Sequence, residues 1–323
     1  MGVSTEPHTP RTPSSPRVVR WLPPWLQNAK ALVRLALASV VSNVVIVVTG
    51  GAVRLTDSGL GCPTWPRCTD ASLTPTGKYT GHDIIEFTNR QLTFVLVAIA
   101  LATWLVAMVR REQRALATGA ALGIPVQAVL GGLTVLTHLN PWLVAAHFLL
   151  SMLLIAVTFL LWWRLRASVP APTSGAAVLL ARFTIVATAA TLAIGTVVTG
   201  SGPHAGDTAS NGTIRRTGLN VSSMSQLHAD AVMVLIGLSV GLVLLLRAVH
   251  AAAAAQKAAA ALVGVELAQG LIGYTQYFLD VPPLLVGLHM LGACLVWLAA
   301  LRVLVTVVPE ASARPRFANE LSA

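Results

Sequence analysis

LVAAHFLLSMLL (143–154) and LVGLHMLGACLV (285–296) are two apolar stretches that share the pattern Leu-Val-x-x-His. Each belongs to a run long enough for a membrane-spanning helix. Around them, 55% of the 323 residues are hydrophobic and 11% are charged, and the mean hydropathy is +0.72. This composition predicts an all-α membrane protein that crosses the bilayer several times, and it excludes an ordinary soluble domain.

Runs of about 20 apolar residues with few charges predict eight transmembrane helices. Lys and Arg gather in alternate loops, which predicts that both termini are cytoplasmic. The net charge of +10 is therefore a topology signal, because the scattered basic residues form no single patch for nucleic acid. We expect the spans at 33–53, 84–109, 115–136, 143–163, 177–200, 225–247, 258–278 and 284–307.

The shared pattern indicates that the chain is duplicated. Leu-Val-x-x-His falls at the start of the fourth and eighth spans, and VVTG (47–50) recurs in the fifth span at 197–200. Since the order of the elements also agrees, we predict two tandem four-helix bundles related by a pseudo-twofold axis. The expected divisions are a disordered cytoplasmic tail at 1–32, an N-terminal half at 33–165, a linker at 166–176, a C-terminal half at 177–308 and a cytoplasmic tail at 309–323.

Three histidines, His147, His228 and His289, lie at matching depth near the outer ends of predicted spans. Each is a packed residue, a proton relay or a ligand, and ionisable groups within a membrane are functional candidates by default. His228 and His289 belong to two spans of one bundle, so their imidazoles can bind opposite faces of a flat macrocycle. This arrangement predicts a bis-histidine haem b, whereas zinc needs three or four close ligands.

The first half lacks the matching pair of imidazoles. Asn89 occupies the position equivalent to His228, and an amide is a poor ligand for haem iron. A site with His147 alone leaves one iron face open, as an exchangeable macrocycle requires. His82, one turn before Glu86, is an alternative source of a second imidazole.

Glu86 and Arg90 lie four residues apart on the same predicted helix. Glu86 either acts on a substrate or pairs with Arg90 to hold the helix. Arg90 contacts either Glu86 or a haem propionate. Cys62 and Cys68 flank PTWPR in the first outside loop, where an oxidising compartment permits a disulfide.

Seven ordered motifs resemble those of the haem A synthase family, over about residues 35 to 307. The resemblance implies an eight-span oxidoreductase of the bacterial plasma membrane. Such an enzyme oxidises the C8 methyl group of haem O to a formyl group, which gives haem A for cytochrome c oxidase. The motifs are TGGAVRLTDSGLGCPTWPRC (49–68), IEFTNR (85–90), QAVLGGLTVL (127–136), AAHF (145–148), GTVVTGSGPHAGD (195–207), QLHAD (226–230) and GLHMLGA (287–293).

The resemblance also assigns roles to individual residues. It makes His228 and His289 the axial ligands of haem b, near the outer face, and His147 a ligand of the haem O iron. Glu86 matches the acid of the family's E-x-x-H motif and is the expected catalytic residue, as a base or charge stabiliser. Asn89 stands where many members have the motif's histidine. A redox role for the cysteine pair is also implied, with a structural disulfide as the alternative.

Two other functions stay open: a di-haem b-type cytochrome, and a haem-handling assembly chaperone without catalysis. Asn89 and Glu86 argue against the cytochrome, which needs ligand pairs for two permanent haems. The expected partners are the lipid bilayer, haem O and an electron donor that the sequence does not identify. Direct transfer of an apolar intermediate suggests a complex with haem O synthase, and a homo-oligomer is a further hypothesis.

Overall fold

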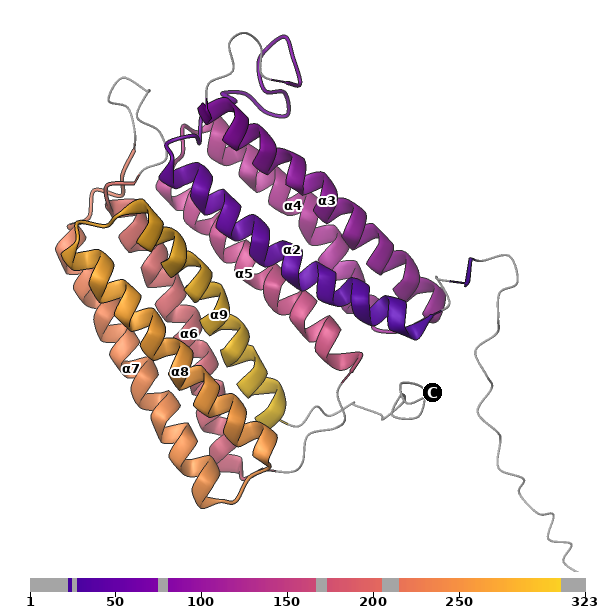
Figure 1. Ribbon diagram of the computed structural model, residues 1–323, viewed down its shortest axis with the longest axis vertical. Helices are drawn as coiled ribbons and strands as arrows, with labels where there is room; N and C mark the ends of the chain where they lie inside the picture. The colour runs from indigo at the N-terminus through magenta and orange to yellow at the C-terminus, as the bar shows by residue number, and fades with distance from the viewer. Residues whose placement is uncertain (1–22, 25–27, 75–80, 167–172, 205–214, 309–323) are drawn as a thin grey trace, which may run out of the picture.

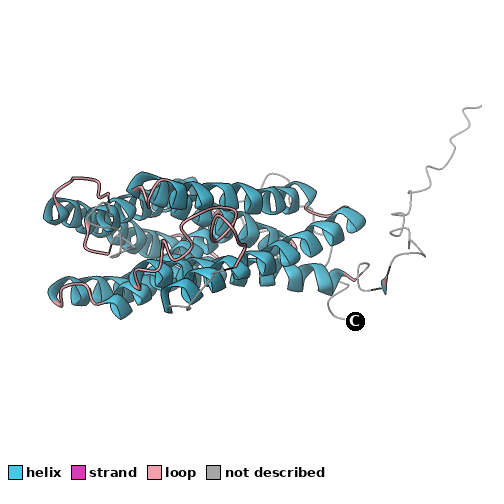
Figure 2. Ribbon diagram, turned by 90° about the horizontal axis from the view of Figure 1, so that it is seen from above, coloured by secondary structure: helices cyan, strands magenta, loops and turns pink. Residues whose placement is uncertain are grey.

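The computed structural model describes residues 23–24, 28–74, 81–166, 173–204 and 215–308. Most of both predicted tails and part of the predicted linker lie outside these residues. The described part contains helices and no strands (Figure 2). The eight long helices are α2 (Ala29–Leu55), α3 (Gly81–Arg110), α4 (Arg114–Leu136), α5 (Pro141–Arg164), α6 (Gly175–Ser201), α7 (Val221–Ala248), α8 (Ala253–Phe278) and α9 (Pro283–Val307).

All eight helices are long and apolar enough to cross a membrane, which confirms the predicted multi-pass membrane protein. They begin up to five residues before the predicted spans. Polar N-caps precede α2 and α7. The side chain of Asn28 accepts from the Lys30 amide at 2.8 Å, and that of Asn220 accepts from the Ser223 amide at 2.9 Å. Such caps satisfy amides that the helix leaves unpaired.

The helices form two rings of four. In the first ring α2, α3, α4 and α5 each contact the next and α5 contacts α2; α6, α7, α8 and α9 repeat this order. The rings lie side by side (Figure 1) and touch through α2 with α9, α5 with α6, and α5 with α9. In each ring the second and fourth helices, α3 with α5 and α7 with α9, therefore face each other across a diagonal.

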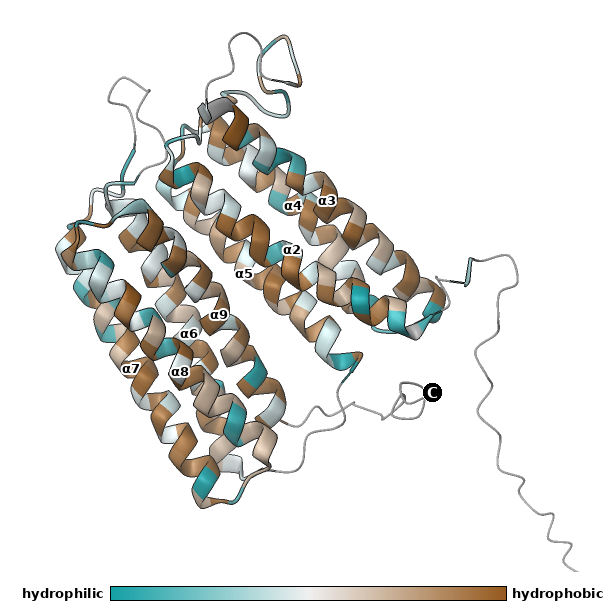
Figure 3. Cartoon of the chain, viewed as in Figure 1, coloured by the Kyte–Doolittle hydropathy of each residue, from teal (hydrophilic) through white to brown (hydrophobic). Residues whose placement is uncertain are grey.

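The two ends of the helices are filled differently. We call the end that carries the loop between α2 and α3 the disulfide end, and the other the opposite end (Figure 1). At the opposite end apolar side chains fill both rings, with Leu32, Val106 and Leu161 fully buried in the first ring. Leu242 and Leu262 are buried in the same way in the second ring. Brown, apolar residues cover most of each helix in Figure 3.

A seam of apolar side chains joins the two rings. Val40 and Phe159 of the first ring pack with Leu301 and Val305 of the second. Within this seam the Trp297 indole of α9 donates to the backbone carbonyl of Met152 on α5 at 2.8 Å. The rings are thus held against each other, and the space that remains extends from the disulfide end as far as Trp104 in the first ring.

Candidate functional site

A cavity of about 2020 Å³ is lined by residues of both rings, including His147, His228 and His289. Pockets for a single small ligand usually measure about 300 to 1,000 Å³. Its lining is mostly apolar, and it extends to side chains such as Phe94 on the outer surface of α3. The cavity therefore has the size and chemistry to hold two large apolar ligands.

In the second ring, His228 of α7 and His289 of α9 face each other across the diagonal. Their ring centres are 6.4 Å apart and the ring planes are inclined by 70°. Two imidazoles that bind one metal ion from opposite sides through bonds of about 2 Å have ring centres about 6 Å apart. The two side chains therefore fit the axial ligation of a single haem iron.

Each of these imidazoles packs against a glycine of the preceding helix. A Cβ on Gly195 would lie 3.1 Å from His228 Cε1, and a Cβ on Gly273 would lie 3.1 Å from His289 Cε1. The Nδ1 atoms of both histidines are buried and have no hydrogen-bond partner among the described residues. Burial of Nδ1 leaves Nε2 as the nitrogen available to a ligand in the cavity.

His147 of α5 is held in the same way in the first ring. A Cβ on Gly131 of α4 would lie only 2.9 Å from His147 Cε1. The Gln127 amide donates to the His147 carbonyl at 2.8 Å, as Gln269 does to the His289 carbonyl at 2.7 Å. The pattern Gln-x-x-x-Gly on the third helix of each ring and the histidine on the fourth helix thus recur in both halves.

Asn89 of α3 takes the remaining ligand position. Its side-chain oxygen accepts from the Thr49 hydroxyl at 2.8 Å, and a Cβ on Gly50 would lie 3.9 Å from its side-chain nitrogen. Gly50 is therefore the counterpart of Gly195, which faces His228.

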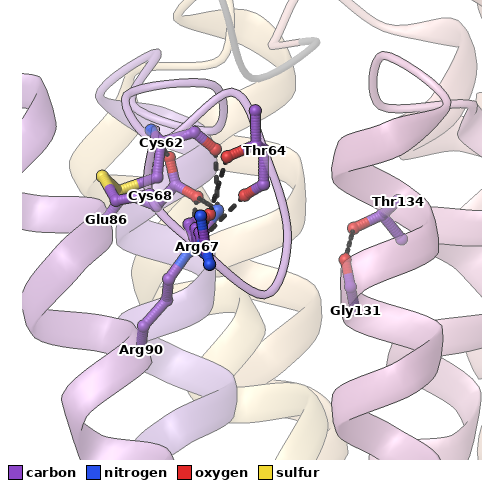
Figure 4. Close-up of polar contacts among 8 residues, drawn as sticks. All are labelled: Cys62, Thr64, Arg67, Cys68, Glu86, Arg90, Gly131 and Thr134. Carbon is purple, nitrogen blue, oxygen red and sulfur yellow. Dashed lines mark hydrogen bonds and ion pairs between the residues drawn. A yellow bond between two sulfur atoms is a disulfide. The ribbon is translucent and has the colours of Figure 1, made fainter. Parts of the chain in front are cut away.

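Glu86 does pair with Arg90, and together they hold the first loop. Glu86 is buried, and its Oε1 accepts from two Arg90 nitrogens at 2.6 and 3.0 Å. Its Oε2 accepts from the Cys62 amide at 2.7 Å. Arg90 also donates to the carbonyls of Cys62 at 2.7 Å and Thr64 at 3.1 Å (Figure 4). The acid and the guanidinium therefore fasten the loop to α3.

The fastened loop is closed by a disulfide and lies over the first-ring end of the cavity. Cys62 and Cys68 form the disulfide, with Cα atoms 4.4 Å apart, which confirms the predicted pairing. Trp65 and Pro66 between them line the cavity. The Trp65 ring fills the space beside Gly132, next to the glycine that contacts His147. This loop thus covers the mouth of the first-ring site.

The structure brings most of the predicted residues to one cavity. Glu86, Asn89 and Arg90 line it from α3, and the three histidines line it from α5, α7 and α9. The side chain of His82 lies outside the described residues, so its proposed alternative role is untested. Cys294 is fully buried in a packed apolar cluster.

Two functional candidates were missed from the sequence. Arg54 lines the cavity, and it donates to the carbonyls of His204 at 2.6 Å and Thr199 at 3.0 Å across the seam. These partners are neutral, so the guanidinium keeps its positive charge for an anionic ligand. Glu266 of α8 is a buried carboxyl in the same cavity. The signal that could have identified both is an ionisable residue within or beside an apolar span.

The described residues contain no cluster of three or more His, Cys, Asp or Glu side chains that would hold a metal ion by themselves. The donors instead come as a facing pair in the second ring and as a single imidazole in the first. A haem supplies four nitrogen ligands of its own, so it needs from the protein only one or two axial donors. The donor set therefore suits haem.

Known proteins match part of the chain. A 33% match over 132 residues links the chain to a protein of Geobacillus thermodenitrificans named Heme A synthase, and covers 39% of this chain and 41% of that protein. Proteins of the same name match from Listeria welshimeri serovar 6b (30% over 131 residues; 39% and 43%) and Lysinibacillus sphaericus (33% over 141; 42% and 45%). The chain is thus matched over less than half the length of these relatives.

A family model covers far more of the chain. The model described as "Cytochrome oxidase assembly protein" (COX15-CtaA) matches residues 33–83 and 77–301. These ranges contain all eight helices apart from a few terminal residues, and every cavity residue discussed above. The chain therefore belongs to the COX15-CtaA family of cytochrome oxidase assembly proteins.

Proposed function

We propose that this protein is a haem A synthase, which oxidises the C8 methyl group of haem O to a formyl group to give haem A for cytochrome c oxidase. The observation that carries the proposal is the difference between the two diagonals of one cavity. Two imidazoles face each other on α7 and α9, whereas α5 offers His147 and α3 offers Asn89. The facing pair of imidazoles in the second ring suits a fixed cofactor. The single imidazole in the first ring suits a substrate that must leave.

In the second ring, His228 and His289 would hold haem b as its two axial ligands. Bound there, haem b would supply one-electron redox chemistry. Gly195 and Gly273 make room for the imidazoles, and Gln269 fixes the backbone of His289. Arg54, whose charge is not neutralised by its carbonyl partners, would attract haem propionates at the disulfide end.

In the first ring, His147 would bind the iron of haem O, and Asn89 would leave the opposite face open or weakly bound. The remaining apolar volume accepts the macrocycle and its hydrocarbon tail. Trp65 and the disulfide loop above this site would keep water from the reacting edge. His147 thus orients the substrate, and the loop shields it.

Glu86 is our candidate for the catalytic acid or base, on the resemblance and on its place in the cavity lining. Both of its oxygens accept hydrogen bonds from the loop and from Arg90. A carboxylate so held is a fixed negative charge beside the substrate site, which would stabilise positive charge that develops at the methyl carbon. Proton transfer by Glu86 would require the Cys62 or Arg90 contact to open.

The proposal places the protein in a bacterial plasma membrane with both termini in the cytoplasm and the disulfide end outside. Its lipid-facing cavity suits delivery of haem O from the bilayer or from haem O synthase. The electron donor would reach haem b from outside the chain. A homo-oligomer is compatible with the exposed apolar helix faces that any membrane protein presents.

The test is mass-resolved chromatography of haems from cells that make haem O but lack a haem A synthase. We expect haem A when the chain is expressed and none with an empty vector. His147→Ala should abolish haem A. His250→Ala is the matched control, because His250 is exposed beyond the end of α7, and it should leave haem A unchanged. Haem O alone beside a chain that carries haem b would reject the proposal.

A haem-handling chaperone without catalysis is the second candidate. The observation in its favour is that both oxygens of Glu86 are occupied by structural partners. This function predicts that haem O is recovered unchanged from the purified protein. It also predicts that Glu86→Gln does not alter the delivery of haem to the oxidase.

A further inference from the structure

A second acidic side chain lies in the cavity, away from the disulfide loop. Glu266 of α8 is 3% exposed and Ser239 of α7 is fully buried. The Ser239 hydroxyl donates to Glu266 Oε1 at 2.8 Å. The other oxygen, Oε2, is buried and has no hydrogen-bond partner among the described residues, although Glu266 belongs to the cavity lining. The carboxyl therefore has one oxygen free for a proton or a water molecule.

The first ring has no such pair at the equivalent place. Ser239 follows His228 by eleven residues, and Ala100 follows Asn89 by the same number. Glu266 precedes Gly273 by seven residues, and Ile124 precedes Gly131 by seven. Ala100 and Ile124 pack together in one buried apolar cluster. The duplicated fold is thus stable with two apolar residues here, so the second ring carries its acid for a purpose other than packing.

The surroundings of Glu266 lack a compensating cation. The charged residues on the neighbouring helices are exposed. The ion pairs found among the described residues involve Glu86 and Glu112, not Glu266. The titratable interior groups on the helices packed against α8 are His228 of α7 and His289 and Cys294 of α9. The exposed charged groups are Asp230 and Arg247 of α7, Lys257 of α8, Arg182 of α6 and Arg302 of α9.

We propose that Glu266 and Ser239 form a proton-binding site that is coupled to the redox state of the haem held by His228 and His289. Glu266 takes up a proton when that haem is reduced and releases it on oxidation. Glu266 lies seven residues from Gly273, or about 10 Å along the helix, and charges interact over this range in a membrane interior. The added proton compensates the added electron.

The inference rests on the proposed binding of haem b in the second ring. Its step is balanced: a reductant such as dithionite gives one electron to the haem iron, and one proton from the solvent binds a carboxylate oxygen of Glu266. No bond between heavy atoms forms or breaks. Ser239 holds Oε1 through its hydroxyl, so Oε2 is the oxygen left to exchange the proton with the cavity.

The experiment is a spectroelectrochemical titration of the haem-loaded, full-length protein over a range of pH. In the wild type we expect the midpoint potential to fall as pH rises. One proton per electron corresponds to about 59 mV for each tenfold change in proton concentration. In Glu266→Gln, which keeps the oxygen that accepts from Ser239, the potential should no longer depend on pH over that range. A pH-independent wild type would overturn the proposal.

Thr184→Ala is the matched control, since Thr184 is a buried hydroxyl of the same ring that donates to its own helix at Leu180, at 2.9 Å. It should keep the wild-type slope. Ser239→Ala leaves the carboxyl in place and should move the pH range over which the potential changes. An unaltered profile in Glu266→Gln, or in Ser239→Ala if the first variant loses its haem, would refute the coupling. A wild type without bound haem would instead reject the proposed function.

Discussion

On the proposed function, the identity of Asn89 decides whether the first ring holds its ligand permanently. The Gly50 backbone leaves space beside it, since a Cβ there would still be 3.9 Å from the Asn89 side chain. Asn89→His should therefore complete a second facing pair with His147. We expect the variant to purify with additional low-spin haem and to form less haem A, because two axial bonds slow the exchange of the macrocycle. Optical and electron paramagnetic resonance spectra of the purified protein measure this.

Asn89→Gln is the matched control for that experiment, because it changes the size of the side chain without adding an imidazole. It should not add a low-spin signal. If Asn89→His gave no new low-spin haem in cells that accumulate haem O, α3 and α5 would not hold a ligand between them. The assignment of the substrate to the first ring would then be wrong.

For Glu86, the question is whether haem A formation depends on its negative charge or on its contacts with the loop. Glu86→Gln keeps an oxygen that can accept from Cys62 or Arg90 but removes the negative charge. Loss of a positioned acid or base commonly costs about 100-fold or more in rate. We expect a fall of that size in haem A formed per protein, measured on extracted haems, while haem binding persists.

The loop gives the control for Glu86→Gln. If the variant keeps the loop closed, the Cys62–Cys68 disulfide should resist reduction and labelling as in the wild type. Full activity of Glu86→Gln would remove Glu86 from catalysis. Loss of activity together with an opened loop would mean that Glu86 holds the loop in place through its contacts with Cys62 and Arg90.

At the scale of helices, the ligand positions depend on small residues in the neighbouring helix. Gly131→Ala would place a methyl group 2.9 Å from His147 Cε1, which is closer than packed atoms accept, so the imidazole must move. Changes next to a metal ligand typically weaken binding about 10- to 100-fold. We expect haem O to bind Gly131→Ala correspondingly less tightly in an optical titration, with the second-ring spectrum unchanged.

Gly119→Ala on the same helix is its control. Gly119 is exposed, and an added Cβ would make an ordinary contact at 3.9 Å with Val157. This variant should bind haem O as the wild type does and be slightly more stable, because alanine favours helix. Equal affinities of the two variants would show that His147 tolerates displacement and is not the iron ligand.

The helices themselves were predictable from sequence, and their mutual contacts were not. All eight spans were found because a helix that crosses a bilayer needs about 20 apolar residues in a row. The helices begin up to five residues before the predicted spans, and a polar cap such as Asn220 precedes some of them. The approach of Gly195 to His228 joins residues on separate helices. Nothing in the local pattern fixes the rotation of one helix against the next, so a match such as VVTG does not by itself identify the glycine that lies beside a histidine.

Site residues that are rare within membrane-spanning helices could be predicted from the sequence. The three histidines stand out among apolar neighbours, and the structure brings each of them to the cavity. Arg54 has no such apolar surroundings in the sequence, because it lies near the end of its span, and its guanidinium contacts the backbone of α6 across the seam. Glu266 was overlooked because a single acid in an otherwise apolar span hardly changes the hydropathy on which the span was recognised.

In the whole molecule, both rings open into one cavity. The apolar seam with Phe159 and Leu301 and the Trp297 hydrogen bond keep the rings in a fixed relation. Arg54 adds a polar link from α2 to the end of α6. On the proposed function, an electron that reaches the second ring would therefore need no second protein molecule to reach the first ring. Both sites should have to be intact in the same chain.

Coexpression of two inactive variants tests this directly. His147→Ala removes the first-ring ligand, and His289→Ala removes one imidazole of the facing pair. Each should yield no haem A alone, and the two together should still yield none, because no chain then carries both sites. Restored haem A would mean that electrons cross between chains in an oligomer. A chain carrying both substitutions beside a wild-type chain is the control, and the wild-type copy should keep its activity because it contains a complete cavity.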